Sequence, residues 1–358
     1  MNNIDVGWRE YQQQVPHLEL SGGDHVGRVI AEHKTNVVLA TDEGDRTAVV
    51  RGKAHRLGGM AQKPKVGDWV VYEREGGEGV VAIEKMLPRY SLLQRRGAGN
   101  EHASQVLVTN IDFVIIVQGL DANFNINRLE RYLVMVDNSG AQSIVVLNKV
   151  DLVDDPEQYR VHVQAIAPDV PVVLLSALTD TGVDELLDIL QPQTTSVFVG
   201  SSGVGKSTLL NRLLDSDIQS TQGLRDDDQG KHTTTHREMF LLPSGAIVID
   251  TPGMRELSVK GLDTLGDTFT SVEQLTEQCR FRDCDHEKSK GCALLAAVED
   301  GSLDRKQYAN YLKLRREVAY ANSQVDDESK YERKKQQQEL YKSYRKITRA
   351  KYKDQGFR

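Results

Sequence analysis

The stretch SVFVGSSGVGKSTLLNRLL, residues 196–214, decides the fold. Its apolar start leads into Gly200-Ser-Ser-Gly-Val-Gly-Lys-Ser207, which satisfies G-x-x-x-x-G-K-[ST], and a helix-like run follows at once. In such a loop the backbone N–H groups wrap phosphates, Lys206 neutralises phosphate oxygens and the Ser207 hydroxyl ligates magnesium. We therefore expect a nucleotide site on a strand–loop–helix unit. The residues expected to line it are Gly200, Ser201, Ser202, Gly203, Val204, Gly205, Lys206, Ser207 and Thr208.

Apolar runs that alternate with helical runs surround this unit. IDFVIIV (111–117), SIVVL (143–147) and PVVLLS (171–176) each precede a helix-like stretch, and MFLLP (239–243) and AIVID (246–250) come later. Near-continuous Val, Ile and Leu runs followed by helices are typical of a parallel sheet covered on both faces. We therefore predict a doubly wound α/β domain over residues 98–261.

Asn148-Lys149-Val150-Asp151 follows SIVVL directly, so its side chains are expected at the carboxyl edge of the sheet, where ligands of open α/β folds bind. This text resembles the N-K-x-D guanine-specificity motif of GTPases. The Asp151 carboxylate would accept hydrogen bonds from the guanine N1–H and exocyclic amine, a donor pair that adenine lacks. Asn148 would steady the loop, and the Lys149 stem would cover the base. Ser176-Ala177-Leu178 follows the next strand and resembles the loop whose backbone N–H meets the guanine oxygen.

Asp250-Thr-Pro-Gly253 closes the last apolar run and resembles the D-x-x-G switch motif. Asp250 would hold magnesium through water, and the Gly253 N–H would meet the γ-phosphate. Upstream, Lys231-His-Thr-Thr-Thr-His236 lies where a first switch belongs. Thr234 is the predicted magnesium ligand, with Thr233 and Thr235 as alternatives; the run also fits simple β-propensity.

Lys206, Ser207, Thr234, Asp250 and Gly253 form the predicted catalytic set. Met254 stands where many GTPases carry a water-positioning Gln. Because an apolar side chain cannot orient water, we expect slow intrinsic hydrolysis that another residue or a bound partner completes. His232 and His236 are candidates for that role.

The order of these motifs is unusual. Most GTPases run from the P-loop through the switches to N-K-x-D and S-A-x, whereas the last two come first here. This order predicts a circular permutation, which a compact domain tolerates because its termini lie close together. The chain that leaves Gly253 would then lead directly into the C-terminal region.

Two further domains flank the predicted GTPase domain. Short β-runs over residues 25–97 suit a small closed barrel of the oligonucleotide-binding (OB) type, or else a β-domain used for packing. Cys279-x4-Cys284-x-His286-x5-Cys292 offers three thiolates and an imidazole, the ligand set of a closed structural zinc site, with free thiols as the alternative. We place a zinc-binding helical domain at 262–325, an N-terminal extension at 1–24 and a basic helical tail at 326–358.

The charge of the 358-residue chain is uneven. Residues 330–358 hold eleven Lys and Arg against three acidic residues, a local +8, so the total of −7 leaves −15 for residues 1–329. An acidic body with a basic end suggests a polyanionic partner. No apolar run reaches the roughly 18 residues of a membrane span, and no secretory signal is visible at the start. We expect a cytoplasmic monomer without membrane contact.

Taken together, the barrel, NKVD, SAL, GSSGVGKST, KHTTTH and DTPG in permuted order, and the C-x4-C-x-H-x5-C spacing resemble the RsgA (YjeQ) family of circularly permuted ribosome biogenesis GTPases. The resemblance implies binding to the small (30S) ribosomal subunit and its rRNA late in maturation, with GTP hydrolysis stimulated by the subunit. It implies GTP and GDP, Mg²⁺ and one structural Zn²⁺ as ligands. DDDQGKH stands in place of the GRGRH often seen in the first switch.

Two other functions stay open from the residues. A GTP-controlled switch that binds another RNA or a protein would use the same nucleotide motifs. An ATP-dependent small-molecule kinase would use the P-loop but would leave NKVD, SAL and the cysteine cluster without a role.

Overall fold

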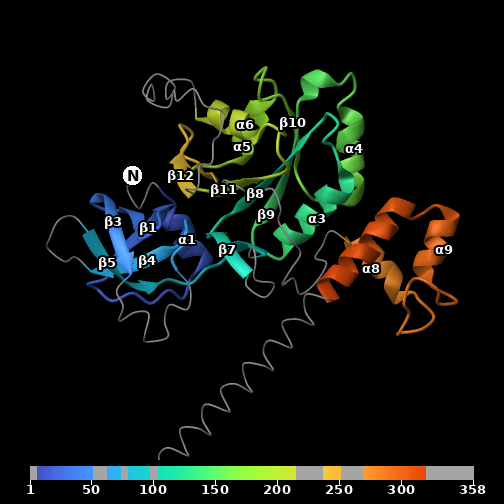
Figure 1. The fold of residues 1–358 in the computed structure, drawn as a ribbon, viewed down its shortest axis with the longest axis horizontal. Helices are drawn as coiled ribbons and strands as arrows, with labels where there is room; N and C mark the ends of the chain where they lie inside the picture. Colours follow the sequence, from blue (N-terminus) through green and yellow to red (C-terminus); the bar gives the residue numbers. More distant parts are fainter. Residues whose placement is uncertain are drawn as a thin grey trace, which may run out of the picture.

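The computed structural model describes residues 6–50, 63–73, 80–96, 104–214, 237–250 and 269–319. Within these ranges the chain forms a small β-barrel, a sheet flanked by helices and a helical C-terminal part (Figure 1). This architecture confirms the multidomain α/β fold class predicted from the sequence. Among the described helices, none combines the length and the apolar character needed to cross a bilayer.

Five strands close the barrel: β1 (His25–Glu32), β2 (Val37–Thr41), β3 (Gly44–Val50), β4 (Trp69–Glu73) and β5 (Val80–Met86). β1 pairs with β2 and β4, β2 pairs with β3, and β5 joins β3 to β4, so the ring is complete. Fully buried side chains fill the interior, among them Val29, Leu39, Val70 and Ile83. In β1 and in β4 four successive residues are buried, so these two strands are covered on both faces.

The nucleotide motifs lie on a second group of strands: β8 (Phe113–Gly119), β9 (Gln142–Asn148), β10 (Val172–Leu175), β11 (Thr195–Val199), β12 (Arg237–Leu241) and β13 (Ile247–Asp250). Their order is β10-β9-β8-β11-β13-β12, and each pair is parallel except β12–β13. The P-loop strand β11 is therefore central.

Helices cover both faces of this sheet. They are α3 (Ile126–Asp137), α4 (Glu157–Ile166), α5 (Val183–Ile189) and α6 (Lys206–Leu213), and the short 3-10 helix η1 (Val150–Leu152) follows β9. Ile116 packs in the same core as Leu129 of α3, whereas the neighbouring Ile115 packs in the core that contains α5 and α6. Successive strand residues thus serve opposite faces, which explains why the strands read as continuous apolar runs.

The barrel and the α/β sheet are hydrogen-bonded to each other. Strand β1 pairs antiparallel with β12, so all eleven of these strands form one sheet. Beside this seam the Arg28 guanidinium is buried; it donates to Thr195 Oγ1 (2.9 Å), to the Asn110 carbonyl (2.7 Å) and to the Val6 carbonyl. The Arg28 guanidinium also lies 5.4 Å from the centre of the Trp69 ring.

The N-terminal segment packs onto the barrel through α1 (Trp8–Gln14). Tyr11 is buried, stacks on Trp8 and donates its hydroxyl proton to the Pro88 carbonyl at 2.7 Å. A hairpin of β6 (Leu92–Arg96) and β7 (Ser104–Thr109) connects the barrel to β8. The domain limits drawn from the sequence stay predictions, and those near residues 97 and 261 lie outside the described residues.

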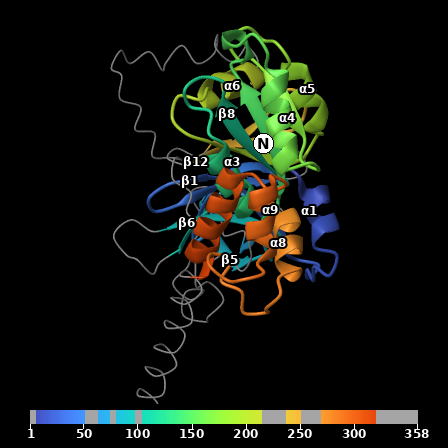
Figure 2. The ribbon, with the colours of Figure 1, turned by 90° about the vertical axis from the view of Figure 1, so that its right-hand side faces the viewer.

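The C-terminal part consists of α8 (Thr270–Glu277), α9 (Ala293–Asp300) and a helix over 305–319. Val272, Leu294 and Leu314 form its buried centre. This part lies beside α3 (Figure 2), where the Arg131 guanidinium makes two hydrogen bonds, of 2.7 and 3.1 Å, to the Glu317 carboxylate. The helix over 305–319 therefore anchors the C-terminal part to the α/β domain.

Candidate functional site

Two glycines of the P-loop are required by close contacts. Gly200 has φ +145°, and a Cβ added there would lie 2.4 Å from the Val117 carbonyl oxygen of β8. Gly205 has φ +98°, and its Cβ would lie 2.2 Å from the Asn148 Nδ2 atom. Any larger residue at either position would push the loop away from the sheet edge.

The P-loop leads into α6 at Lys206. The Lys206 ammonium donates to the carbonyl oxygens of Gly200 and Ser201, each at 2.8 Å, so it lies within the loop. Ser207 and Thr208 are exposed in the first turn of α6. The free N–H groups and the dipole of a helix N-terminus favour anionic ligands, so phosphate groups fit here.

Asn148 joins the three segments that the sequence motifs identified. Its side chain is buried; Nδ2 donates to the Val204 carbonyl (2.7 Å) and Oδ1 accepts from the Ala177 N–H (3.0 Å). The Ala177 N–H is therefore bonded to Asn148 here. Ser176 is buried and closes its own turn, since its Oγ accepts from the Thr179 N–H at 3.2 Å. The predicted phosphate-binding and base-binding segments thus meet at one edge of the sheet.

Lys149 makes a second bridge to the P-loop. It adopts φ +70°, and its Nζ atom donates to the Gly203 carbonyl and to Asp121 Oδ2, both at 2.6 Å. Asp151 follows, exposed, in η1 next to Val150. Sequence reasoning missed Asp121, although an acidic residue shortly after strand β8 faces the same sheet edge as the motifs.

Asp250 ends β13 and is exposed, on the strand next to β11. Thr234 and Gly253 of the predicted catalytic set lie outside the described residues. So do Thr233, Thr235, His232, His236 and Met254. Lys206 and Ser207 lie at the start of α6, after the P-loop that follows β11, and Asp250 lies at the end of the neighbouring strand β13. The roles of these three residues stay predictions.

Cys279, Cys284, His286 and Cys292 form a compact cluster. Their ligand atoms all lie within 4.8 Å of one another, and all but Cys279 are buried. Cys279 Sγ is 3.5 Å from His286 Nδ1 and 4.0 Å from Cys292 Sγ, and Cys292 Sγ is 3.8 Å from His286 Nδ1. A tetrahedral zinc ion with these ligands requires edges of about 3.5–3.8 Å, close to the 3.5–4.0 Å between Cys279, His286 and Cys292, so the ligand set is consistent with zinc.

The backbone around the cluster is held by neighbouring elements. His286 adopts φ +61°, and its carbonyl accepts from the Tyr308 hydroxyl at 2.7 Å. Cys292 precedes α9, whose first N–H, that of Ala293, points to Cys279 Sγ at 3.4 Å. Four protein ligands leave no open coordination position, so a metal here would be structural rather than catalytic.

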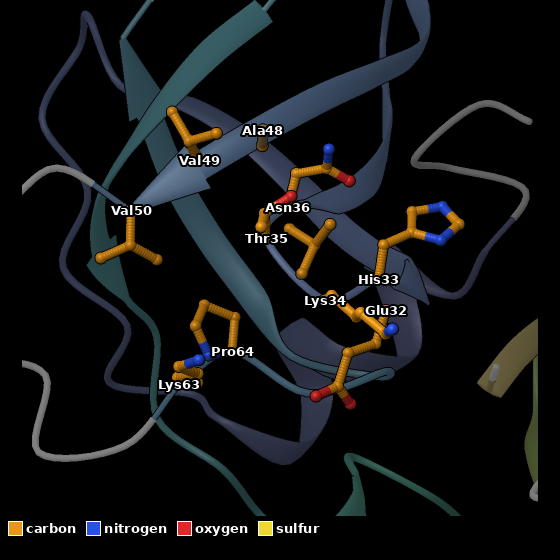
Figure 3. Close-up of a pocket in the computed structure, with 11 residues that line it drawn as sticks. Glu32, His33, Lys34, Thr35, Asn36, Ala48, Val49, Val50, Lys63 and Pro64 are labelled. Atoms are coloured by element: carbon orange, nitrogen blue, oxygen red, sulfur yellow. The ribbon is translucent and has the colours of Figure 1, made fainter. Parts of the chain in front are cut away.

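A groove on the barrel is separate from these centres. It has a volume of about 190 Å³ and lies between the β1–β2 loop, β3 and residues 63–64 (Figure 3). Lys34 and Lys63 contribute ammonium groups, while Val49 and Val50 contribute apolar surface. Such a lining suits a ligand that carries both negative charge and apolar faces.

Comparisons with known proteins agree with this geometry. The family described as RsgA GTPase matches residues 86–260, and one described as 50S ribosome-binding GTPase matches residues 195–346. The small ribosomal subunit biogenesis GTPase RsgA of Opitutus terrae is 43% identical over 338 residues, which cover 91% of this chain and 92% of that protein. This chain belongs to the RsgA GTPase family.

Other RsgA proteins and solved structures extend the match. The RsgA of Methanosarcina acetivorans is 37% identical over 356 residues, which cover 97% of this chain and 95% of that protein. The crystal structure of YjeQ from Thermotoga maritima has a TM-score of 0.62 at 29% identity and covers 83% of this chain and 99% of that one. YloQ, described as a circularly permuted GTPase, has a TM-score of 0.56 at 27% identity and covers 85% and 98%. These likenesses confirm the predicted permuted arrangement of the RsgA fold.

Proposed function

We propose that this RsgA-family protein hydrolyses GTP as a late maturation factor of the small ribosomal subunit, and that binding to the subunit and its rRNA stimulates hydrolysis. The observation that carries the proposal is the junction at Asn148, which hydrogen-bonds both the P-loop and the Ser176–Ala177 loop. Relatives that share most of their length with this chain are named for small-subunit biogenesis. A cytoplasmic location and a monomeric state are part of the same proposal.

Different residues are proposed to bind the phosphates, the base and the metal ions. Lys206 and the N-terminus of α6 receive the phosphates, and Asp151 receives the guanine edge. Ser207, Thr234 and Asp250 are the proposed magnesium ligands, directly or through water; Mg²⁺ would neutralise charge on the phosphate oxygens. The Cys279, Cys284, His286 and Cys292 side chains would hold one structural Zn²⁺ and so fix the loop between α8 and α9.

Two surfaces are proposed to contact rRNA. The barrel groove offers Lys34 and Lys63. On the C-terminal part, Phe281 is 49% exposed and its ring lies 5.5 Å from the Arg280 guanidinium. Exposed aromatic rings beside arginines stack on unpaired bases while the guanidinium groups meet phosphates.

The test compares GTP hydrolysis by the protein alone, with purified small subunits and with purified large subunits. We expect small subunits to raise the rate at saturating GTP about tenfold or more, because a bound partner completes the hydrolytic site. Lys206→Ala is the control, since it removes phosphate neutralisation and should show no stimulated rate. Equal stimulation by large subunits, or stimulation by neither, would contradict a role in small-subunit maturation and favour a GTP-controlled switch with another target.

A further inference from the structure

Asp121 lies outside every motif recognised in the sequence, in the loop between β8 and α3. Its Oδ2 atom accepts from Lys149 Nζ at 2.6 Å, and its Oδ1 atom accepts from the Asn123 N–H at 2.9 Å. Gly119 leaves room for the carboxylate, because a Cβ there would lie 3.0 Å from Asp121 Oδ1. The Asp121 carboxylate is therefore built into the loop rather than free on the surface.

The contact acts on a residue that touches the P-loop. Lys149 donates to the Gly203 carbonyl at 2.6 Å, so its ammonium lies between the P-loop and Asp121. A lysine side chain is flexible, and two partners fix an ammonium group that one partner would leave free to rotate. The hydrogen bond from Lys149 also holds the pKa of the Asp121 carboxyl below its ordinary value, so the carboxylate is charged at neutral pH.

The position of Asp121 is set in turn by the start of α3. Asn125 caps this helix by accepting from the Arg128 N–H at 3.0 Å, and the Arg128 guanidinium donates to the Asn123 carbonyl. These contacts fix the short loop that carries Asp121. Because the loop is anchored on a helix, its carboxylate can hold Lys149 in place before any nucleotide binds.

We propose that Asp121 is a positioning residue of the guanine nucleotide site: it holds Lys149 against the P-loop and so places the Lys149 stem and the following η1 turn for the base. This inference rests on the proposed GTP site. GDP and GTP share the base and differ only at the γ-phosphate. The loss of Asp121 should therefore weaken both to the same extent and raise KM more than it lowers kcat.

The experiment is a double-mutant cycle on nucleotide affinity in the full chain. Fluorescent GDP and a fluorescent non-hydrolysable GTP analogue are titrated into wild type, Asp121→Ala, Lys149→Met and the double variant. Side chains of Asp121 and Lys149 are 24% and 26% exposed, so solvent screens the pair and we expect Asp121→Ala to lose about three- to tenfold for both nucleotides. In the Lys149→Met background, Asp121→Ala should cost nothing further.

Asp169→Ala is the matched control, because Asp169 is an exposed acid of the same domain and its removal changes the net charge equally. Melting temperatures of all variants check folding, and Asp121→Asn replaces Asp121→Ala where the alanine variant melts early. Two outcomes would overturn the role of Asp121. One is a loss of nucleotide affinity in the double variant that equals the product of the losses in the two single variants; the other is wild-type affinity in both Asp121→Ala and Asp121→Asn. If the wild-type protein bound no guanine nucleotide, the proposed function would fail, and the role of Asp121 would fail with it.

Discussion

Asn148 links the P-loop to the loop that follows β10. Its side chain is buried; the amide nitrogen donates to the Val204 carbonyl, and the amide oxygen accepts from the Ala177 N–H. Asn148→Ala would leave the Val204 carbonyl and the Ala177 N–H buried without a hydrogen-bond partner. Each such group lowers the free energy of unfolding by about 1–3 kcal/mol. We expect a lower free energy of unfolding and at least about tenfold weaker GDP and GTP binding, because P-loop and base loop lose their common support.

Calorimetry and nucleotide titration measure the two effects of Asn148→Ala. Asn211→Ala, at an exposed position of α6, is the control for removing an amide without removing a bridge. Unchanged nucleotide affinity in Asn148→Ala would mean that the P-loop keeps its shape without the bridge.

Asp151 is exposed in η1 and so has a free carboxylate for a ligand edge. Asp151→Asn keeps the size but turns one acceptor oxygen into a donor, which opposes the N1–H and amine of guanine. We expect GTP selectivity over ATP to fall by about two orders of magnitude, in line with the strong discrimination that paired hydrogen bonds give. Competition of labelled GTP by ATP and by inosine triphosphate, which lacks the exocyclic amine, provides the measurement. Wild-type selectivity in Asp151→Asn would place the base elsewhere.

At the level of elements, α3 is the shared support of two parts of the molecule. Its N-terminal loop carries Asp121, and its side contacts the helix over 305–319 through Arg131 and Glu130. Glu130 is buried beside a cavity of about 420 Å³, which His162, Asp304 and Lys306 also line. The Asn310 side-chain amide donates to the Glu130 carboxylate.

Glu130 makes this contact sensitive to pH. Burial raises its pKa from the ordinary 4.5 to about 7, with Asp304 adding to the rise and the Asn310 hydrogen bond opposing it. A carboxyl group whose pKa is higher in the folded state holds its proton longer there, so stability falls as the pH rises from about 4.5 to about 7 and stays lower above. Glu130→Gln removes the charge while its carbonyl still accepts from Asn310.

We expect Glu130→Gln to be more stable than wild type by at most about 3 kcal/mol near pH 8, and nearly equal to it near pH 4. Thermal unfolding at the two pH values checks this. Glu299→Gln, exposed on α9, is the control for losing one negative charge. The same difference between Glu130→Gln and wild type at both pH values would show that the Glu130 carboxyl group keeps its solution pKa.

Elements and motifs with local patterns could be predicted from the sequence, and contacts across the chain could not. The runs MFLLP and AIVID, read as strands over 239–243 and 246–250, correspond to β12 over Arg237–Leu241 and β13 over Ile247–Asp250. The pairing of β1 with β12 joins residues more than 200 positions apart, and no periodicity within either strand encodes its partner. Arg28 and Asp121 were missed for the same reason, because their partners Thr195 and Lys149 lie 167 and 28 positions away.

At the scale of the whole molecule, the C-terminal part lies against α3, away from the P-loop (Figure 1). The contacts that dock it are Arg131–Glu317 and Asn310–Glu130, whereas Lys149 and Asn148 contact the P-loop. No described hydrogen bond or ion pair joins residues 279–292 to these nucleotide-site residues. Within the described residues, the cysteine–histidine cluster and the P-loop edge of the sheet are therefore separate structural units, and α3 contacts the C-terminal part.

Cys284→Ala tests this separation. It removes one of four ligands from a buried cluster, so zinc content should fall from one ion per chain to a small fraction and the loop held by Cys279, His286 and Cys292 should lose its order. We expect stimulation by small subunits to fall about tenfold or more if this loop presents Arg280 and Phe281 to rRNA. Affinity for GDP should stay within about twofold of wild type, because distant sites without shared partners act independently.

Metal analysis, nucleotide titration and subunit-stimulated hydrolysis are measured on one preparation, with Glu299→Ala as the control on α9. Loss of GDP affinity in Cys284→Ala would show that the cysteine–histidine cluster and the P-loop are coupled rather than separate.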